Sequence, residues 1–266
     1  NELLFGTRDT WILWKLTEGR SHFTEATNAS RTMIYDIQKN EWSDELLNLF
    51  DIPKSILPEV KNSADNFGTT SLFGDEISIG GIAGDQQAAT IGQACFDPGS
   101  VKSTYGTGCF MLMNTGENLR ISQNNLLTTI AYRINGETCY ALEGSIFIAG
   151  AAIQWLRDSL KIIKSAEETE ELYSRSDPSQ QIYLVPAFVG LGAPYWEGDA
   201  RGSLFGMTRN TGIPELVKAA IDSIAYQTKD LIIAMEKDSE LKISRLKVDG
   251  GMVKNEKFLQ FLSNIL

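Results

Sequence analysis

Residues 103–110 read Ser103-Thr-Tyr-Gly-Thr-Gly-Cys-Phe110, the first of three glycine-rich turns on which the fold assignment depends. The runs at 101–105 and 109–113 predict two strands, and the glycines predict a tight hairpin between them. The backbone N–H groups of such a turn, together with the Thr107 hydroxyl, can hold a phosphate group. An ordinary hairpin turn is the alternative, and a Gly-Thr-Gly sequence taken alone favours it.

A second glycine-rich turn carries a carboxylate. Gly81-Ile-Ala-Gly-Asp85 ends a predicted buried strand at 77–82 and precedes a predicted helix at 86–93. In α/β proteins ligands bind at such strand ends, and the glycines let a substrate approach the backbone. Asp85 is therefore a candidate catalytic residue, and the alternative is that it only caps the helix.

The third turn lies near the end of the sequence. Val248-Asp-Gly-Gly251 follows a predicted strand at 246–248, and Asn255 comes four residues later. Glycines in this position allow a flat base or a phosphate to lie near the positive end of a helix dipole. A loop glycine pair without a ligand is equally compatible with this turn taken alone.

The rest of the chain alternates helices and strands. Thr7 and Ser43 are expected to cap helices in the first third, and Asn135-Gly136 predicts a type I′ hairpin. The remaining pattern predicts strands at 126–134, 137–142 and 182–185 and helices at 151–163 and 217–235. This order indicates an α/β fold with mixed sheets. The turn at 96–99 is the candidate boundary between two domains, 1–96 and 97–266.

Composition excludes several classes of function. Apolar residues make up 42% and charged residues 22% of the 266 residues, which is typical of a globular protein. The net charge of −10 disfavours binding to nucleic acid, and the sequence lacks the run of about eighteen apolar residues needed for membrane insertion. Three cysteines without CxxC spacing argue against a disulfide framework or zinc site and favour the cytoplasm. His22 is the single histidine, so a general base would be a carboxylate.

The ends of the sequence lead us to expect a fragment of a longer protein. Asn1 rather than Met stands first, and the last residues, 258–266, form an amphipathic helical pattern without a Gly or Pro stop signal. A terminus made by processing is the alternative.

Taken together, the three turns resemble those of the actin-like ATPase (ribonuclease H-like) fold, in which two α/β domains clamp a nucleotide. Longer motifs lie around and between these turns, namely Gly81-Ile-Ala-Gly-Asp-Gln-Gln-Ala88, Thr104-Tyr-Gly-Thr-Gly-Cys-Phe-Met-Leu-Met-Asn-Thr-Gly116, Gly190-Leu-Gly-Ala-Pro-Tyr-Trp196, Gly202-Ser-Leu-Phe-Gly-Met207 and Ser223-Ile-Ala-Tyr-Gln227. Over the whole chain these motifs resemble the FGGY carbohydrate kinases, and in particular the members that act on glycerol.

The resemblance implies a role for each matching residue. Asp85 matches the catalytic base, with Asp85, Gln86 and Phe110 around the substrate. Five residues match nucleotide contacts, namely Thr107, Gly150, Gln154, Gly251 and Asn255. No protein metal ligand is matched within this chain. Residues 1–96 would be the C-terminal part of the substrate-binding domain, and residues 97–266 the N-terminal part of the nucleotide-binding domain.

The implied activity is that of an ATP:glycerol 3-phosphotransferase, which makes sn-glycerol 3-phosphate with ATP and Mg²⁺ as cofactors. The partners would be glycerol and ATP or ADP, without nucleic acid or membrane insertion, in a cytoplasmic homo-oligomer at full length. The fragment alone is expected to be inactive, because the family's first phosphate hairpin and much of its glycerol pocket precede Asn1. A kinase for another polyol or pentulose, or a non-catalytic nucleotide-binding module, remains an alternative.

Overall fold

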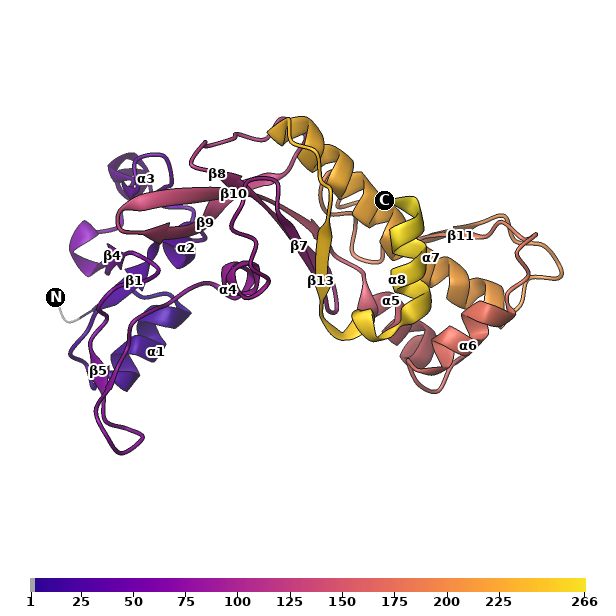
Figure 1. The fold of residues 1–266 in the computed structure, drawn as a ribbon, viewed down its shortest axis with the longest axis horizontal. Coiled ribbons are helices and arrows are strands. Elements are labelled where there is room, and N and C mark those ends of the chain that lie inside the picture. Colours follow the sequence, from indigo (N-terminus) through magenta and orange to yellow (C-terminus); the bar gives the residue numbers. More distant parts are fainter. Residues whose placement is uncertain (1–2) are drawn as a thin grey trace. The chain divides into compact units, whose positions relative to one another are not determined.

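The computed structural model describes residues 3–266, and these form two compact units (Figure 1). Unit 1 comprises the chain up to Pro98 with segments 114–120 and 128–141, and unit 2 comprises segments 99–113, 121–127 and 142–266. The chain first passes from one unit to the other at Pro98–Gly99. Segments 114–120 and 128–141 group with unit 1 because Leu119, Ile130 and Tyr140 pack in its core.

Up to Pro98, unit 1 is built from short elements. In chain order these are α1 (Arg8–Leu16), β1 (Phe23–Glu25), α2 (Ala26–Ala29), β2 (Tyr35–Asp36), β3 (Glu41–Trp42), α3 (Asp44–Leu49), the 3-10 turn η1 (Lys54–Ile56), β4 (Glu59–Lys61), β5 (Thr69–Thr70), β6 (Ile77–Ser78) and α4 (Asp85–Gly92). Strands β1 and β4 pair in parallel, whereas β2 pairs antiparallel with β3 and β5 with β6.

The predicted helix starts of unit 1 are correct, but only one of the two caps forms. The Ser43 hydroxyl accepts a hydrogen bond from the N–H of Leu46 at 3.3 Å, as an N-cap residue should. Thr7 stands at the N-cap position of α1, yet its hydroxyl donates to the carboxylate of Asp9 instead. The Thr7 hydroxyl therefore bonds the nearby Asp9 carboxylate and does not cap α1, although the sequence pattern predicts that it should.

The buried strand predicted at 77–82 is wrong. Only Ile77–Ser78 pair, antiparallel with β5, and Ile77 is 47% exposed. Beyond them an isolated bridge joins Gly81 to Ala64. Residues 79–82 still form backbone hydrogen bonds with Gly68, Phe67, Asp65 and Ser63, but no regular strand forms around the glycine pair at 80–81.

The principal sheet has five strands in the order β13-β7-β8-β10-β9. Its members are β7 (Val101–Tyr105), β8 (Cys109–Gly116), β9 (Leu127–Ile134), β10 (Glu137–Ile146) and β13 (Leu246–Asp249). Strand β7 is antiparallel to β8 and parallel to β13, so the sheet is mixed, as the sequence predicts. Asn135 and Gly136 both have positive φ angles, of 53° and 82°, which confirms the predicted type I′ turn.

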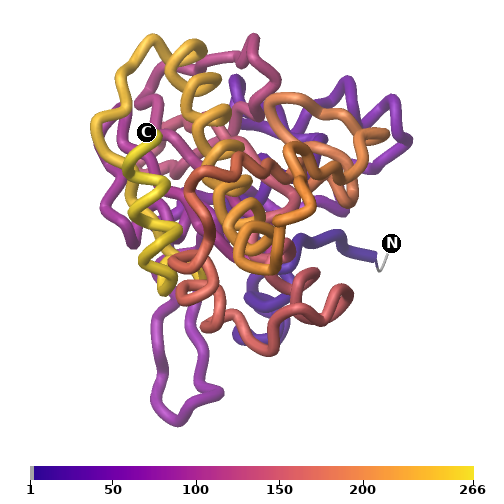
Figure 2. The backbone as a smooth tube through the Cα atoms, turned by 90° about the vertical axis from the view of Figure 1, so that its right-hand side faces the viewer, coloured from indigo at the N-terminus to yellow at the C-terminus, as the bar shows by residue number. Residues whose placement is uncertain are grey.

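The helices of unit 2 cover the core under this sheet. They are α5 (Gly150–Gln154), the π-helical turn η2 (Trp155–Ser159), α6 (Glu168–Arg175), α7 (Ile213–Ser239), the 3-10 turn η3 (Gly251–Lys254) and α8 (Glu256–Ile265). A small antiparallel pair, β11 (Tyr183–Val185) and β12 (Ser203–Phe205), completes the unit. Helix α7 packs against α6 and α8, and Figure 2 shows α8 beside it.

Two predictions for unit 2 need correction. The helix predicted to run to residue 163 ends at Ser159, because its last turn widens and Lys161 adopts a left-handed conformation with φ of 56°. The strand predicted to be buried at 182–185 is β11, in which Leu184 is buried but Tyr183 is 44% exposed.

The three cysteines form no disulfide. Cys95, Cys109 and Cys139 are free, buried thiols. His22 lies in the loop before β1, where its ring Nε2 is 2.7 Å from the carbonyl oxygen of Phe5. Within residues 3–266 no helix combines the length and apolarity needed to span a membrane.

Candidate active site

Unit 2 contains a cavity of about 360 Å³ at the turns singled out in the sequence. All five residues that match nucleotide contacts line it, although they come from three separate parts of the chain. Its walls are formed by the β7–β8 hairpin (Tyr105, Gly106, Thr107), the start of α5 and η2 (Gly150, Ile153, Gln154, Arg157), the segment before and at the start of α6 (Ala166, Glu167, Thr169, Glu170) and η3 with its end (Gly251, Met252, Lys254, Asn255).

Glycine is required where these segments meet. The N–H of Gly150 donates to the carbonyl of Gly106 at 2.9 Å, and a Cβ on Gly150 would lie 2.6 Å from that oxygen. Gly250 has φ of +97°, and a Cβ there would lie 2.3 Å from the carbonyl oxygen of Tyr105. The hairpin, α5 and the turn after β13 therefore approach one another backbone to backbone, which leaves a cradle for a ligand.

Charge of both signs lines the cavity. Arg157 and Lys254 contribute positive charge, although Arg157 also pairs with Asp158 at 2.6 Å. A hydrogen bond from Ser165 lowers the pKa of Glu167, and the positive charges of Lys254 and Arg157 act in the same direction. A polyanionic ligand would find cationic partners here, and hydroxyl groups of a ligand would find a carboxylate acceptor.

Cys109 lies on β8 beside the hairpin and contributes no reactive group. Its sulfur is 3.0 Å from the Ser103 hydroxyl oxygen, and burial raises the pKa of the thiol to about 12. A buried thiol of this kind behaves as a small hydrophobic residue.

Asp85 belongs to unit 1 and is the first residue of α4. The N-cap residue of α4 is Gly84, so Asp85 is not the helix cap that the sequence allows as the alternative. Its carboxylate is exposed at the positive end of the helix dipole, where it accepts from the N–H of Gln86 at 2.8 Å and from the Gln86 side chain at 3.3 Å. A carboxylate that is exposed, and whose residue is held in place at the start of a helix, is suited to accept a proton from a bound hydroxyl group.

The three residues that match substrate contacts fall on both units. Asp85 and Gln86 lie on unit 1, whereas Phe110 lies on β8 of unit 2, where it pairs in register with Thr104 and is 41% exposed. Within residues 3–266 no group of three or more His, Cys, Asp or Glu side chains could hold a metal ion.

Sequence profiles of known families match nearly the whole chain. The profile described as "FGGY family of carbohydrate kinases, N-terminal domain" matches residues 2–92, and the one described as the C-terminal domain of the same family matches residues 101–266. The chain belongs to the FGGY family of carbohydrate kinases.

Within the FGGY family, the chain is more similar in sequence to glycerol kinases than to a xylulose kinase. A glycerol kinase of Sinorhizobium fredii is 61% identical over all of this chain, and one of Streptococcus agalactiae is 56% identical. A crystal structure of Plasmodium falciparum glycerol kinase with ADP matches 98% of the chain at a TM-score of 0.90 and 40% identity. A xylulose kinase of Lactobacillus acidophilus, 23% identical with a TM-score of 0.79 over 96% of the chain, shares the fold. The chain spans about half the length of these relatives, 52–54%.

One wall of the cavity in this FGGY chain is not predicted from its sequence. Asn255 uses its side-chain oxygen to cap α8, accepting from the N–H of Phe258 at 2.9 Å, and its amide donates to the buried Thr169 hydroxyl at 2.9 Å. The N–H of Glu256 donates to Glu170. The start of α8 thereby holds the start of α6 against the cavity. Asn255 precedes the helical pattern at 258–266, but nothing local in the sequence signals its partner 86 residues away.

Proposed function

We propose that the protein to which this chain belongs is an ATP-dependent glycerol kinase that makes sn-glycerol 3-phosphate. The observation that carries this proposal is the cavity of unit 2, since all five residues matching the family's nucleotide contacts line it. The identity of about 60% with glycerol kinases across the whole chain supports glycerol as the substrate.

The proposed reaction uses Asp85 as the general base. Its carboxylate accepts the proton of the glycerol 3-hydroxyl group while that oxygen forms a bond to the γ-phosphorus of ATP. The bond between the γ-phosphorus and the bridging oxygen breaks, and ADP leaves. Gln86 would hold glycerol beside the base, and Phe110 would lie against its carbon atoms. Phosphoryl transfer depends mainly on positioning and on stabilising charge, so this small set of groups is sufficient in kind.

The nucleotide would lie in the cavity of unit 2. We assign Thr107 to the β- and γ-phosphate side, Gly150 and Gln154 to the nucleotide at the start of α5, and Gly251 with Asn255 to the adenosine. The close backbone approaches at Gly150 and Gly250 fit this assignment, because phosphates and flat bases bind against glycine turns. Mg²⁺ would neutralise phosphate charge; it is usually held by one or two carboxylates and the phosphates themselves, and we assign it no ligand in this chain.

We place the protein in the cytoplasm, because three free, buried thiols suit a reducing compartment. The homo-oligomer expected at full length stays a prediction, which light scattering of the purified protein measures.

The decisive experiment replaces Asp85 in the protein at its natural length. Asp85→Asn keeps the shape of the side chain but removes the proton acceptor, and we expect turnover of glycerol to fall at least about a hundredfold. Asp75→Asn, which makes the same change at an exposed position of unit 1, is the matched control and should retain full activity. The affinity for ADP should be unchanged in both variants, as unit 2 is untouched.

Near-normal turnover of Asp85→Asn would overturn the assignment of the base. A substrate panel that includes glycerol and xylulose tests the substrate separately, and a preference for the pentulose would overturn the assignment of glycerol while leaving the kinase activity in place.

A further inference from the structure

Unit 1 contains a fully buried carboxylate. Glu25, at the end of β1, has no exposed surface. Its oxygens accept from the N–H of Thr27 at 2.9 Å, from the N–H and side-chain amide of Asn28 at 2.8 and 2.9 Å, from the Ser63 hydroxyl at 2.9 Å and from the Thr27 hydroxyl. A buried charge is tolerated only when its hydrogen bonds are satisfied in this way, so Glu25 fixes the orientation of every group around it.

The Thr27 hydroxyl is oriented by this carboxylate. Because a carboxylate only accepts, the Thr27 proton points toward Glu25 and its lone pairs point away. They accept the N–H of Gly84 at 2.8 Å. Thr27 is itself completely buried, so water does not compete for the bond. Gly84 is the N-cap of α4 and the residue directly before Asp85.

Ser63 gives a second point of attachment for the same loop. Its hydroxyl donates to Glu25, and its backbone carbonyl accepts the N–H of Ile82 at 3.0 Å. Ser63 is fixed in turn by Arg133, whose backbone carbonyl accepts the Ser63 N–H at 2.7 Å and whose N–H donates to the Ser63 hydroxyl at 3.2 Å. The N–H groups of Ile82 and Gly84 are thus held by two residues that both bind one carboxylate.

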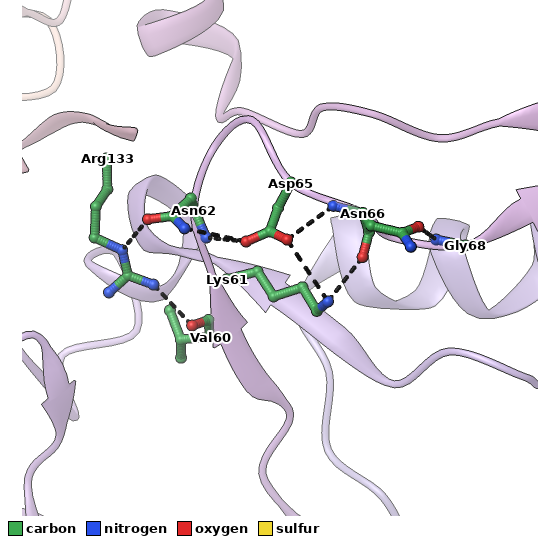
Figure 3. A network of polar contacts seen from close by, with 7 residues as sticks. All are labelled: Val60, Lys61, Asn62, Asp65, Asn66, Gly68 and Arg133. Atoms are coloured by element: carbon green, nitrogen blue, oxygen red, sulfur yellow. Dashed lines mark hydrogen bonds and ion pairs between the residues drawn. The ribbon is translucent and has the colours of Figure 1, made fainter. Parts of the chain in front are cut away.

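The segment that carries Ser63 is itself braced by side chains, as Figure 3 shows. The Arg133 guanidinium donates to the Asn62 side chain at 3.2 Å and to the carbonyl of Val60 at 2.7 Å. Asn62 donates to Asp65, which also accepts the N–H of Asn66 at 2.8 Å. The turn that carries Ser63, the acceptor for the Ile82 N–H, is therefore held in place by side-chain hydrogen bonds.

We propose that Glu25, acting through Thr27 and Ser63, positions the base Asp85. This inference rests on the proposed function, since it takes Asp85 as the base. Ile79 and Gly80 form backbone hydrogen bonds with residues 65–68, but the attachments nearest to Asp85 are those of Ile82 to Ser63 and of Gly84 to Thr27. These two bonds, both to residues that bind Glu25, therefore fix where α4 begins. Misplacement of a catalytic group by about 1 Å can lower a rate roughly a hundredfold, so this attachment matters for turnover. Thr27 and Ser63 are positioning residues and touch no substrate in this scheme.

The principal test compares Thr27→Val with Thr27→Ser in the protein at its natural length. Valine keeps the volume but removes the acceptor for Gly84, and we expect kcat to fall about ten- to a hundredfold with little change in KM for ATP. Serine keeps the hydroxyl and should restore kcat to within about threefold. Thr32→Val is the matched control, because the Thr32 hydroxyl bonds Ala29 in the same segment but not the loop before Asp85. It should leave kcat unchanged.

A double-mutant cycle separates positioning from a general loss of stability. If Thr27 acts through Asp85, Thr27→Val should cause no further loss of kcat in the Asp85→Asn background, whereas a purely structural effect would lower it again. Should Thr27→Val fail to fold, Ser63→Ala removes the second hydroxyl while keeping the carbonyl, and we expect kcat to fall about three- to tenfold.

The outcomes distinguish this inference from the proposed function. If Asp85→Asn is inactive but Thr27→Val or Ser63→Ala has normal kcat, the positioning role is overturned and the base remains. If Asp85→Asn is itself active, the proposed function fails first. If the losses of kcat in the two single variants multiply in the double variant, the positioning role is also overturned, because Thr27 then does not act through Asp85.

Discussion

The two units hold their candidate site residues by different means. In unit 1 side chains take part: the Thr27 hydroxyl holds the N–H of Gly84 before Asp85, and the hydroxyls of Thr27 and Ser63 both bind the buried Glu25 carboxylate, while the Ser63 backbone carbonyl accepts the N–H of Ile82. In unit 2, backbone holds backbone: Gly150 bonds Gly106, and Gly250 lies against Tyr105. A site held by side chains can be loosened stepwise by conservative substitution. A site held by glycine contacts has no room for even one methyl group, so its substitutions should have an all-or-none effect.

The largest expected effect is that of Gly250→Ala. The added Cβ would lie 2.3–2.8 Å from the carbonyl oxygen, carbonyl carbon and nitrogen of Tyr105, in a residue with φ of +97°. Overlap with backbone and a left-handed conformation should together lower the free energy of unfolding by about 3 kcal/mol or more. Urea unfolding followed by tryptophan fluorescence measures this, and titration with ADP should show that binding is lost with it.

Gly198→Ala is the matched control, because a Cβ there meets no atom within 4 Å. Its effect should stay within about 0.5 kcal/mol. If the two variants are equally stable, the backbone contact at Gly250 does not constrain unit 2.

In unit 1 the next largest effect is expected for Arg133→Met. The guanidinium donates to Asn62, Val60 and the Tyr35 hydroxyl, so its loss leaves acceptors in the partly buried turn of Figure 3 without a donor. Unpaired polar groups of this kind should lower the free energy of unfolding by about 2 kcal/mol. Arg175→Met removes an exposed pair with Glu171 at 3.5 Å and should cost at most about 0.5 kcal/mol. Equal losses in urea unfolding would contradict the expected difference.

A smaller effect is expected at Asn255, where unit 2 does use a side chain. Asn255→Ala removes both the cap of α8 and the bond to Thr169, and should cost about 1 kcal/mol of stability and weaken ADP binding. Asn255→Asp keeps the cap but cannot donate to Thr169. If the α6 wall matters for the nucleotide, the aspartate variant should keep most of its stability yet still bind ADP more weakly in a calorimetric titration. Unchanged ADP affinity in Asn255→Asp would show that the cavity wall formed by the start of α6 does not affect nucleotide binding.

The sequence predicts the glycine-held half of the site better than the half held by side chains. The turn after Val248 and the type I′ turn at Asn135 are local, because Gly250, Asn135 and Gly136 adopt left-handed conformations there. The hairpin before Cys109 is local because it joins two strands that are adjacent in the sequence. In the proposed scheme the position of Asp85 depends instead on the bond from Gly84 to Thr27, 57 residues earlier, and the apolar residues before Asp85 suggest a buried strand that does not form.

The unpredicted wall of the cavity has the same physical cause. Neither Thr169 nor Glu170 belongs to a local motif that signals a ligand site, and both are brought there by contacts with the start of α8. Long-range pairing of single polar side chains leaves no periodic trace in a sequence.

The smallest expected effect concerns pH and compares one carboxylate from each unit. Partial burial alone would raise the pKa of Asp238, but hydrogen bonds from Ser122, Asn124 and two backbone N–H groups outweigh it and lower the pKa. In the same way burial would raise the pKa of Asp65, and bonds from Asn66 and Asn62 lower it. A carboxyl whose pKa is lower in the folded than in the unfolded state stabilises the fold above its unfolded value and loses that contribution as pH falls through the folded value.

Urea midpoints measured from pH 7 to pH 3 should therefore fall below about pH 4, near the ordinary pKa of an aspartate. Asp238→Asn should have a lower midpoint at pH 7 and a flatter acid limb, because the amide cannot gain the proton that weakens the native network. Asp65→Asn should flatten the same limb by less, since the Asp65 side chain is 29% exposed at the surface and its pair with Lys61, at 3.8 Å, is long. An acid limb that is as steep in Asp238→Asn as in the unmodified chain would show that the Ser122–Asn124 network does not couple folding to pH.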